Sequence, residues 1–142
     1  MSMTVYSRRW GSDMDKVTNA KCREYVQQRK PFRGSNLWGE WVVGMTPLAP
    51  SRYVVYSYGQ HFPLFVYTHD CWFENEDKYS VSTSKHRTQS HPLCPTVLLS
   101  THWMRTLADW GYEAIAKKRI LGKDVPQTTH YEADQYAEVT NG

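Results

Sequence analysis

The chain lacks any long hydrophobic run, and this absence excludes a membrane-spanning helix. No window of the 142 residues approaches the run of about 18 apolar residues that such a helix requires. The segment before Gly11 contains Arg8 and Arg9 but no apolar stretch of the signal-peptide type. We therefore expect a protein that stays in the cytoplasm and has no membrane partner.

Cysteine is also scarce. The three cysteines, Cys22, Cys71 and Cys94, are an odd number and form no C-x-x-C pair. A disulfide framework of the kind that stabilises small secreted domains is not expected. We predict reduced, half-buried thiols in a cytoplasmic protein.

Motifs of well-known enzymes are missing as well. The sequence has no glycine-rich phosphate loop ending in GK[ST], and no H-x-T or H-x-S repeat of the kind that two-histidine phosphoesterases use. Nothing near Cys22 or Cys94 pairs a histidine with an orienting acid in a recognisable pattern. No motif identifies a reaction or a cofactor, and we expect the protein to use no cofactor.

What the sequence does contain is the composition of one folded domain. Of its residues, 40% are hydrophobic and 14% aromatic, which excludes wholesale disorder. Ten tyrosines and six tryptophans outnumber four phenylalanines. Tyr and Trp have an apolar body and a polar tip, so they suit both a core near the surface and a face that stacks on planar ligands.

Charge is unevenly distributed along the chain. The net charge is +3 overall, but residues 1–122 hold 16 Lys and Arg against 10 Asp and Glu, and residues 123–142 hold one Lys against four acids. The body is therefore more basic than the whole chain, which slightly favours an anionic partner.

Periodicity and capping signals predict helices at both ends of one domain. Residues 1–11 are expected to form a flexible basic arm, residues 12–122 a single domain, and residues 123–142 a mobile polar tail. Ser12 opens a capping box for a helix from Asp13 to about Lys30, which Pro31 ends. Ser100 caps a second and stronger helix, over about residues 101–121, which Gly122 ends.

The middle of the chain is rich in strand signals. A turn at Gly59-Gln60 predicts a hairpin, and Pro63, which cannot donate to a ladder, places its second strand at or near an edge. Residues 76–95 show no clean periodicity, apart from a brief strand signal at residues 79–83. The expected fold is α+β: a small twisted antiparallel sheet of four to five strands packed by one long C-terminal helix, with an N-terminal helix. The strands are predicted at Leu37–Val43, Tyr53–Tyr58, Phe62–Tyr67, Cys71–Glu74 and Thr96–Leu99.

Two polar segments look more like a site than a core. The first flanks the predicted hairpin tip at Gly59. Such a tip needs a glycine, but it does not need the rings of Tyr58 and His61 on either side. The second packs hydroxyls, cations and an amide into the run after Asp77, as a phosphate site would. The alternative is a solvated Ser/Thr-rich loop that happens to hold cations. The candidate ligand-binding residues are Tyr58, His61, Lys78, Tyr79, Ser82, Ser84, Lys85, His86, Arg87 and Gln89.

These segments also carry a family resemblance. Tyr53-x-Val55-x-Ser57-Tyr58-Gly59-x-His61-Phe62-Pro63-Leu64, followed by Asp77-Lys78-Tyr79-Ser80 and Thr83-Ser84-Lys85-His86-x-x-Gln89, resembles a family of small proteins of unknown function encoded mainly by bacteriophages and other mobile elements. Pro31-Phe32-x-Gly34-x-x-Leu37 is similar to the segment before that block. The resemblance covers about residues 30–120 and implies an origin, not an activity.

A binding module is the function that we expect. In this interpretation a phage-encoded accessory protein, acting in host takeover or counter-defence in the cytoplasm of the infected cell, holds a nucleotide, a nucleic acid or a host defence protein. The basic and hydroxyl side chains would contact phosphates, and the rings of Tyr58, His61 and Tyr79 would stack on a base. A homo-oligomer is possible on this sequence.

Three alternatives remain open at this point. A small phosphodiesterase or nuclease could use His61, His86 and Lys85, or hold a cation with the acids of residues 70–77. A purely protein-binding inhibitor would use neither these catalytic side chains nor a bound cation. Structural zinc is the third, because His69, Cys71, His86, His91 and Cys94 are the right residue types, although their spacing is not that of a standard zinc knuckle.

Overall fold

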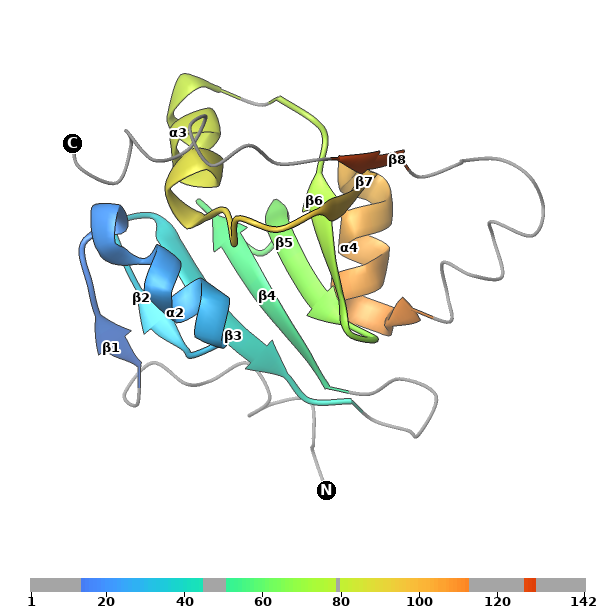
Figure 1. The fold of residues 1–142 in the computed structure, drawn as a ribbon, viewed down its shortest axis with the longest axis horizontal. Coiled ribbons are helices and arrows are strands. Elements are labelled where there is room, and N and C mark those ends of the chain that lie inside the picture. The colour runs from blue at the N-terminus through green and yellow to red at the C-terminus, as the bar shows by residue number, and fades with distance from the viewer. Residues whose placement is uncertain (1–13, 45–50, 79, 113–126, 130–142) are drawn as a thin grey trace.

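One mixed β-sheet forms the centre of the protein. The computed structural model describes residues 14–44, 51–78, 80–112 and 127–129 (Figure 1). Among these residues eight strands lie side by side in their order along the chain. The β1–β2 and β6–β7 pairs are parallel, and the other neighbours are antiparallel. The strands are β1 (Asp15–Lys16), β2 (Phe32–Arg33), β3 (Leu37–Val42), β4 (Arg52–Ser57), β5 (Pro63–Thr68), β6 (Cys71–Asn75), β7 (Thr96–Leu99) and β8 (Gln127–Thr129).

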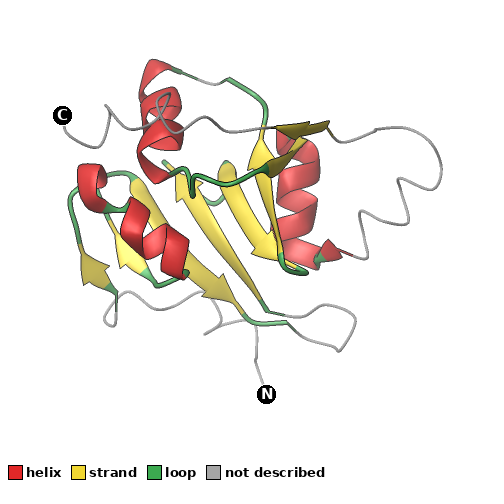
Figure 2. Ribbon diagram, viewed as in Figure 1, coloured by secondary structure: helices red, strands yellow, loops and turns green. Residues whose placement is uncertain are grey.

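Short helices surround the sheet (Figure 2). They are the 3₁₀ helix η2 (Asn19–Lys21), α2 (Arg23–Gln28), α3 (Val81–Ser90) and α4 (Thr101–Trp110). Helix α3 forms the crossover between the parallel strands β6 and β7. Within the described residues, no helix is both long enough and apolar enough to cross a membrane.

The core lies on both faces of the sheet, because the central strand β4 is buried along its whole length. Its side chains alternate between the faces. Val54 and Tyr56 pack with the apolar side of α4, whereas Tyr53 and Val55 pack with Val26 of α2. Full burial of each large apolar side chain contributes roughly 1.5–3 kcal/mol.

The predicted fold class is wrong, although helices and strands do pack together in the described residues. The sheet has eight strands and is mixed, where four to five antiparallel strands were predicted. The strands β1, β2 and β8 have only two or three residues each, too few to show an alternating pattern. The longest helices have ten residues, and the apolar residues that pack on the two faces of the sheet come from α4 on one face and from the shorter α2 on the other.

The C-terminal helix begins as predicted and ends early. Ser100 caps α4 by accepting a hydrogen bond from the backbone N–H of Trp103. The helix stops at Trp110 because Gly111 has a φ of 93°, outside the helical region. The predicted helix ran through this glycine to about residue 121. The predicted continuation beyond residue 112 lies outside the described residues.

Part of the predicted tail belongs to the sheet. Gln127–Thr129 form β8, which pairs antiparallel with β7, so these three residues are not a mobile tail. The remainder of the tail, and the arm over residues 1–11, lie outside the described residues.

The predicted N-terminal helix is mostly not a helix. Asp15–Lys16 pair with β2, and only Arg23–Gln28 are α-helical. Arg29 ends the helix with a φ of 54°, two residues before Pro31. Tertiary pairing with β2 therefore overrides the local helical signal.

The five predicted strands match β3 to β7 closely, but two details of this region differ. Strand β5 lies between β4 and β6 rather than at an edge, and Pro63 is tolerated because it is the first residue of β5, where the register with Tyr56 shifts. The brief strand predicted at residues 79–83 is wrong, since α3 begins at Val81.

Gly39 in β3 allows an unusually close approach of side chains. A Cβ atom here would overlap the hydroxyl of Tyr53 and lie 2.7 Å from the ring of Phe32. The Tyr53 hydroxyl donates a 2.7 Å hydrogen bond to the carbonyl of Lys30. The missing side chain therefore lets Tyr53 tie the central strand to the end of the α2 segment.

Glu74 of β6 is the centre of a buried polar network. Its Oε1 accepts hydrogen bonds from Thr96 Oγ1 at 2.6 Å and from His91 Nε2 at 3.2 Å, and its Oε2 pairs with Arg87 Nη1 at 3.3 Å. His91 Nδ1 accepts from the backbone N–H of Leu93 at 2.9 Å, so the ring proton is on Nε2. The network joins β6, α3 and the segment leading into β7.

The same contacts set the charge state of Glu74. Burial alone raises the pKa of a carboxyl group, but the hydrogen bonds from His91 and Thr96, together with the charge of Arg87, outweigh it and hold the pKa of Glu74 below its ordinary value. Glu74 is therefore ionised at neutral pH.

Replacing Glu74 with Gln is expected to lower the free energy of unfolding by about 3 kcal/mol at pH 7, because Arg87 loses its buried partner. Urea denaturation measures this loss, with the exposed Glu76→Gln as the control. The folded pKa of Glu74 is depressed, so its stabilisation is present above the ordinary value of 4.5 and is lost as the pH falls through the folded pKa. The difference from wild type should therefore shrink near pH 3. A loss below about 1 kcal/mol at pH 7 would contradict this role.

Candidate functional site

Helix α3 carries most of the candidate residues, and it is an unusual helix. The Ser80 side chain caps it by accepting from the backbone N–H of Thr83 at 3.1 Å. Its buried residues are all polar: Thr83, His86, Gln89 and Ser90. Helices of globular proteins normally bury an apolar stripe. Since α3 has none, polar contacts must hold it in place.

These contacts come from neighbouring elements. Arg23 of α2 donates to the backbone carbonyls of Thr88 and His91. The hydroxyl of Ser57, at the end of β4, shares a 2.8 Å hydrogen bond with Nδ1 of His86. Arg87 reaches the opposite way, to Glu74 and to the carbonyl of Asn75. The helix is thereby fixed in its rotation as well as its position.

The turn after β4 brings an aromatic ring to α3. Tyr58 has a φ of 67° and Asn36 a φ of 55°, both in the left-handed region. The backbone N–H of Tyr58 donates to the carbonyl of Asn36 at 2.9 Å. This backbone sets the Tyr58 ring 5.3 Å from the His86 ring, tilted by 34°, and leaves Tyr58 47% exposed.

A third segment completes the arrangement. The side-chain amide of Asn19, in η2, donates to the carbonyl of Ser35 at 3.0 Å, and its oxygen accepts from the backbone N–H of Ser35 at 2.8 Å. A Cβ atom at Gly34 would overlap that Asn19 oxygen, so the glycine permits this reciprocal contact. The turn between β2 and β3 is thus fastened to η2.

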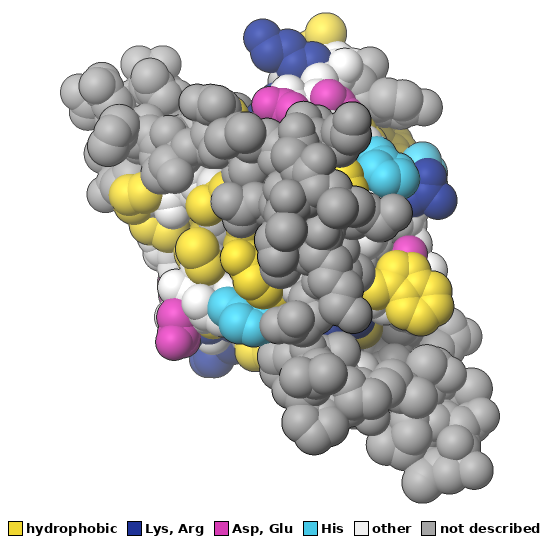
Figure 3. Space-filling view, turned by 90° about the vertical axis from the view of Figure 1, so that its right-hand side faces the viewer, with side chains coloured by type: hydrophobic (Ala, Val, Ile, Leu, Met, Phe, Trp, Pro, Cys, Tyr) yellow, Lys and Arg dark blue, Asp and Glu magenta, His cyan; other side chains and the backbone are white. Residues whose placement is uncertain are grey.

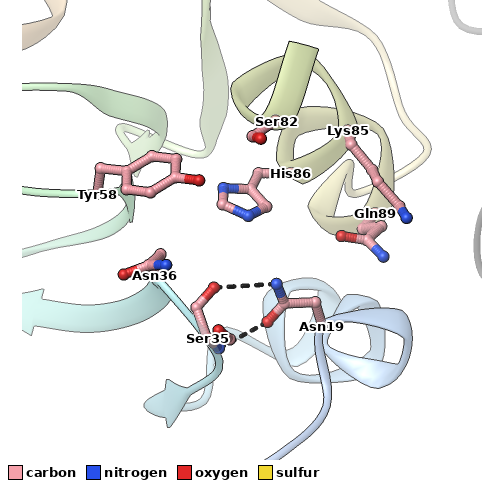
Figure 4. Close-up of a pocket in the computed structure, with 8 residues that line it drawn as sticks. All are labelled: Asn19, Ser35, Asn36, Tyr58, Ser82, Lys85, His86 and Gln89. Carbon is pink, nitrogen blue, oxygen red and sulfur yellow. Dashed lines mark hydrogen bonds between the residues drawn. The ribbon is translucent and has the colours of Figure 1, made fainter. Parts of the chain in front are cut away.

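A pocket of about 240 Å³ lies between these three segments. Figure 4 shows the His86 ring at its centre, with Tyr58 on one side, Lys85 and Gln89 on the other, and Ser35 and Asn19 opposite. The lining residues are Asn19, Ser35, Asn36, Tyr58, Ser82, Lys85, His86 and Gln89. Hydroxyl, amide, imidazole and ammonium groups therefore face one space beside an exposed ring.

The electrostatics of the pocket are mildly positive. Lys85 is exposed, and no Asp or Glu is among the lining residues. Burial, followed by the neighbouring charge of Lys85, lowers the pKa of His86, so this ring is neutral at pH 7. The face shown in Figure 3, by contrast, carries both Lys or Arg and Asp or Glu side chains among its described residues.

Five of the ten predicted site residues line the pocket: Tyr58, Ser82, Lys85, His86 and Gln89. The other described members do not. His61 is exposed and its ring lies against Gly59, since a Cβ atom built on Gly59 would be 2.6 Å from Nδ1 of His61. Lys78 is exposed and precedes α3. Ser84 accepts from Thr88 through its carbonyl, and Arg87 is paired with Glu74. Tyr79 lies outside the described residues.

The sequence analysis missed the residues contributed by the N-terminal third of the chain. Asn19, Ser35 and Asn36 reach the pocket through tertiary pairing of β1, β2 and β3. Two signals were present: Gly34, which marks a close approach, and Asn36, a residue type that tolerates a left-handed backbone.

Metal ligands do not gather in the described part of the chain. No three of its His, Cys, Asp and Glu side chains are placed to hold an ion. Both ring nitrogens of His91 are engaged, by Glu74 and by the N–H of Leu93. Among the acids proposed for a cation, Glu74 is buried in its network, whereas Asp77 accepts from the first N–H of α4 at 2.8 Å.

Cys22 and Cys94 are poor nucleophiles. Burial raises the pKa of Cys22 to about 12 and also raises the pKa of Cys94. The thiolate form that attacks a substrate is therefore scarce for both at neutral pH.

Comparison of the chain with protein-family models, with curated proteins and with solved structures finds no match.

The left-handed backbone at Tyr58 generates a test of this geometry. Tyr58→Ala and Tyr58→Gly both remove the ring, but only glycine adopts a positive φ without steric cost. The glycine variant should be more stable than the alanine variant by about 1 kcal/mol, measured by urea denaturation. Equal stability would show that this turn relaxes to an ordinary conformation without the ring.

Proposed function

We propose that the protein is a binding protein that holds an anionic ligand with a planar ring, a nucleotide or single-stranded nucleic acid, in the pocket between α3 and the Tyr58 turn. The observation that carries this proposal is the convergence of one exposed aromatic ring, one cation and several uncharged polar groups in a single space. Aromatic faces stack on bases, and a lysine with nearby hydroxyls binds phosphate.

The position of the cation supports an anionic ligand. Ser82 and Lys85 lie in the N-terminal half of α3. The dipole of a helix favours negative charge near its N-terminus, so it acts in the same direction as the lysine. The absence of carboxylates among the lining residues leaves that preference unopposed.

Binding is favoured over phosphodiester hydrolysis by the lining of the pocket. General acid–base catalysis on a phosphodiester uses two proton-transferring groups. Of the residues suggested for this role, His86 lines the pocket and His61 does not. Nδ1 of His86 is moreover hydrogen-bonded to Ser57. Because Ser57 is only 1% exposed, its hydroxyl is placed to orient the His86 ring rather than to attack a substrate.

The biological setting that we infer is that of a bacteriophage or another mobile element. The motifs that resemble the phage-encoded family include Tyr58, Lys85, His86 and Gln89, four of the lining residues. A pocket built from such motifs supports an accessory role directed at the host, such as counter-defence in the infected cell. A purely protein-binding inhibitor would leave these residues without a role.

The proposal predicts stabilisation by ligand. In thermal-shift and calorimetric titrations with nucleotides and short oligonucleotides, a ligand at 100 times its Kd should add about 2.7 kcal/mol to the stability, and should be recovered intact with or without Mg²⁺. Lys85→Ala should weaken binding and reduce its salt dependence, because one phosphate contact is lost. Lys78→Ala, which changes an exposed lysine outside the pocket, is the matched control.

Two results would count against this function. If neither nucleotides nor oligonucleotides shift the unfolding temperature of the wild-type chain, the pocket is not a nucleotide site. If the ligands are cleaved, and His86→Ala abolishes the cleavage, the protein is an enzyme instead.

A further inference from the structure

Gln89 is a buried side chain whose amide has no hydrogen-bond partner within the described part of the chain. It is 6% exposed and lines the pocket. Outside the backbone hydrogen bonds of α3 itself, the contact of Gln89 with the described residues is through its backbone carbonyl, which accepts from the thiol of Cys22. Buried polar side chains are nearly always paired, so an amide left open toward a cavity indicates that a ligand or solvent completes it.

His86 places a second polar atom beside this amide. The two residues are three apart on α3 and therefore lie on the same side of the helix. Nδ1 of His86 is taken by Ser57, and no described residue bonds Nε2. His86 is 7% exposed, and its ring faces the centre of the pocket (Figure 4). The floor of the pocket thus presents an amide and an imidazole nitrogen.

The edge of a nucleobase matches this floor. A glutamine amide offers a donor next to an acceptor, and it pairs in two hydrogen bonds with the adjacent acceptor and donor of a base edge. Unpaired bases in single strands are recognised in this way while their faces stack on aromatic side chains. Tyr58, 47% exposed at the rim, offers such a face.

The charge and size of the pocket suit one nucleotide. Lys85 is the single cation among the lining residues, which suits one phosphate group and leaves a triphosphate largely uncompensated. A volume of about 240 Å³ is below the range of roughly 300–1,000 Å³ that is common for sites of larger ligands. A base with part of its sugar fills such a space.

We propose, building on the function proposed above, that the pocket takes one unpaired nucleotide: Gln89 binds the edge of the base, Tyr58 stacks on its face and Lys85 binds its phosphate. The amide can turn by 180° and exchange its donor and acceptor, so amino and keto bases are both accepted. A base within a duplex has its pairing edge occupied and both faces stacked, and is excluded. The nucleotide is either a free nucleoside monophosphate or one unit of a single strand.

Isothermal titration of the full chain with AMP, ATP, ribose 5-phosphate, a single-stranded pentanucleotide and a duplex of the same sequence tests this inference. AMP should bind at least as well as ATP and at least about tenfold more tightly than ribose 5-phosphate, because the base contributes the stacking and edge contacts. Of the two oligonucleotides, only the single strand should bind if the site accepts a nucleotide within a chain. Binding of AMP alone would assign the site to free mononucleotides.

Gln89→Leu keeps the size of the side chain and removes its hydrogen-bonding groups. It should weaken AMP binding by at least about tenfold while leaving the unfolding temperature unchanged or higher, since the amide makes no hydrogen bond with the described residues and an apolar side chain of similar size replaces it. Gln89→Glu, which cannot donate, should also lose binding. Gln28→Ala, which changes an exposed glutamine of α2, is the control and should bind as wild type does.

The outcomes separate this inference from the function on which it rests. If AMP binds equally well to wild type and Gln89→Leu, and more tightly than ribose 5-phosphate, the base-edge role is wrong while nucleotide binding stands. If AMP binds no better than ribose 5-phosphate, the pocket holds a phosphate without recognising a base, and the proposed function fails together with the base-edge role. A Gln89→Leu protein that loses both binding and stability would assign the amide to the fold and would overturn the role. If wild type binds none of the nucleotides or strands, the proposed function itself fails.

Discussion

The buried carboxylate of Glu74 is the constraint on which the pocket depends. By holding Arg87, it fixes the rotation of a helix that has no apolar stripe to do so. Residues of an α-helix are separated by about 100° around its axis, so Lys85 and Gln89 lie about 160° away from Arg87. Anchoring Arg87 toward β6 therefore turns these two side chains toward the pocket. Glu74 does not line the pocket, yet it sets the direction of Lys85 and Gln89, which would contact the ligand.

Attachment through polar contacts also shapes the energetics of α3. Each of its anchors exchanges hydrogen bonds with water for hydrogen bonds within the protein, so the net gain per contact is modest: about 0.5–1.5 kcal/mol for a neutral pair and about 1.5–3 kcal/mol where a charged group takes part. A helix with an apolar stripe would be held more strongly. What the polar arrangement provides is direction, because hydrogen bonds to Ser57, Arg23 and Glu74 are satisfied in one orientation only. Rigid placement of the pocket follows from geometry rather than from hydrophobic burial.

Much of the sheet could be predicted from sequence because its central strands carry β-branched and aromatic runs bounded by Gly and Pro. Helix α3 could not, because helical periodicity is recognised through apolar residues. Its repeat is present at Ser82, Lys85, His86 and Gln89, which follow helical spacing, but every member is polar. The same polarity that concealed the helix singled out its residues as a candidate site. The contribution of Asn19 and Ser35 was missed for another reason: apart from the hint given by Gly34, it arises from strand pairings of two residues each, which leave no pattern in the sequence.

The close packing at Gly39 couples residues 39 and 53, which lie far apart in the sequence, so that a substitution at one affects the other. The hydroxyl of Tyr53 occupies the space that a side chain at residue 39 would need, and this hydroxyl closes the hydrogen bond to Lys30. The two positions are coupled: a larger residue at 39 displaces the tyrosine, and loss of the tyrosine removes the closest of the contacts that exclude a side chain there, leaving that of the Phe32 ring. Lineages that retain this fold should therefore keep or exchange the pair together. Joint inheritance of a glycine and a tyrosine fourteen positions apart offers a marker by which remote descendants can be recognised after the polar residues of the pocket have diverged.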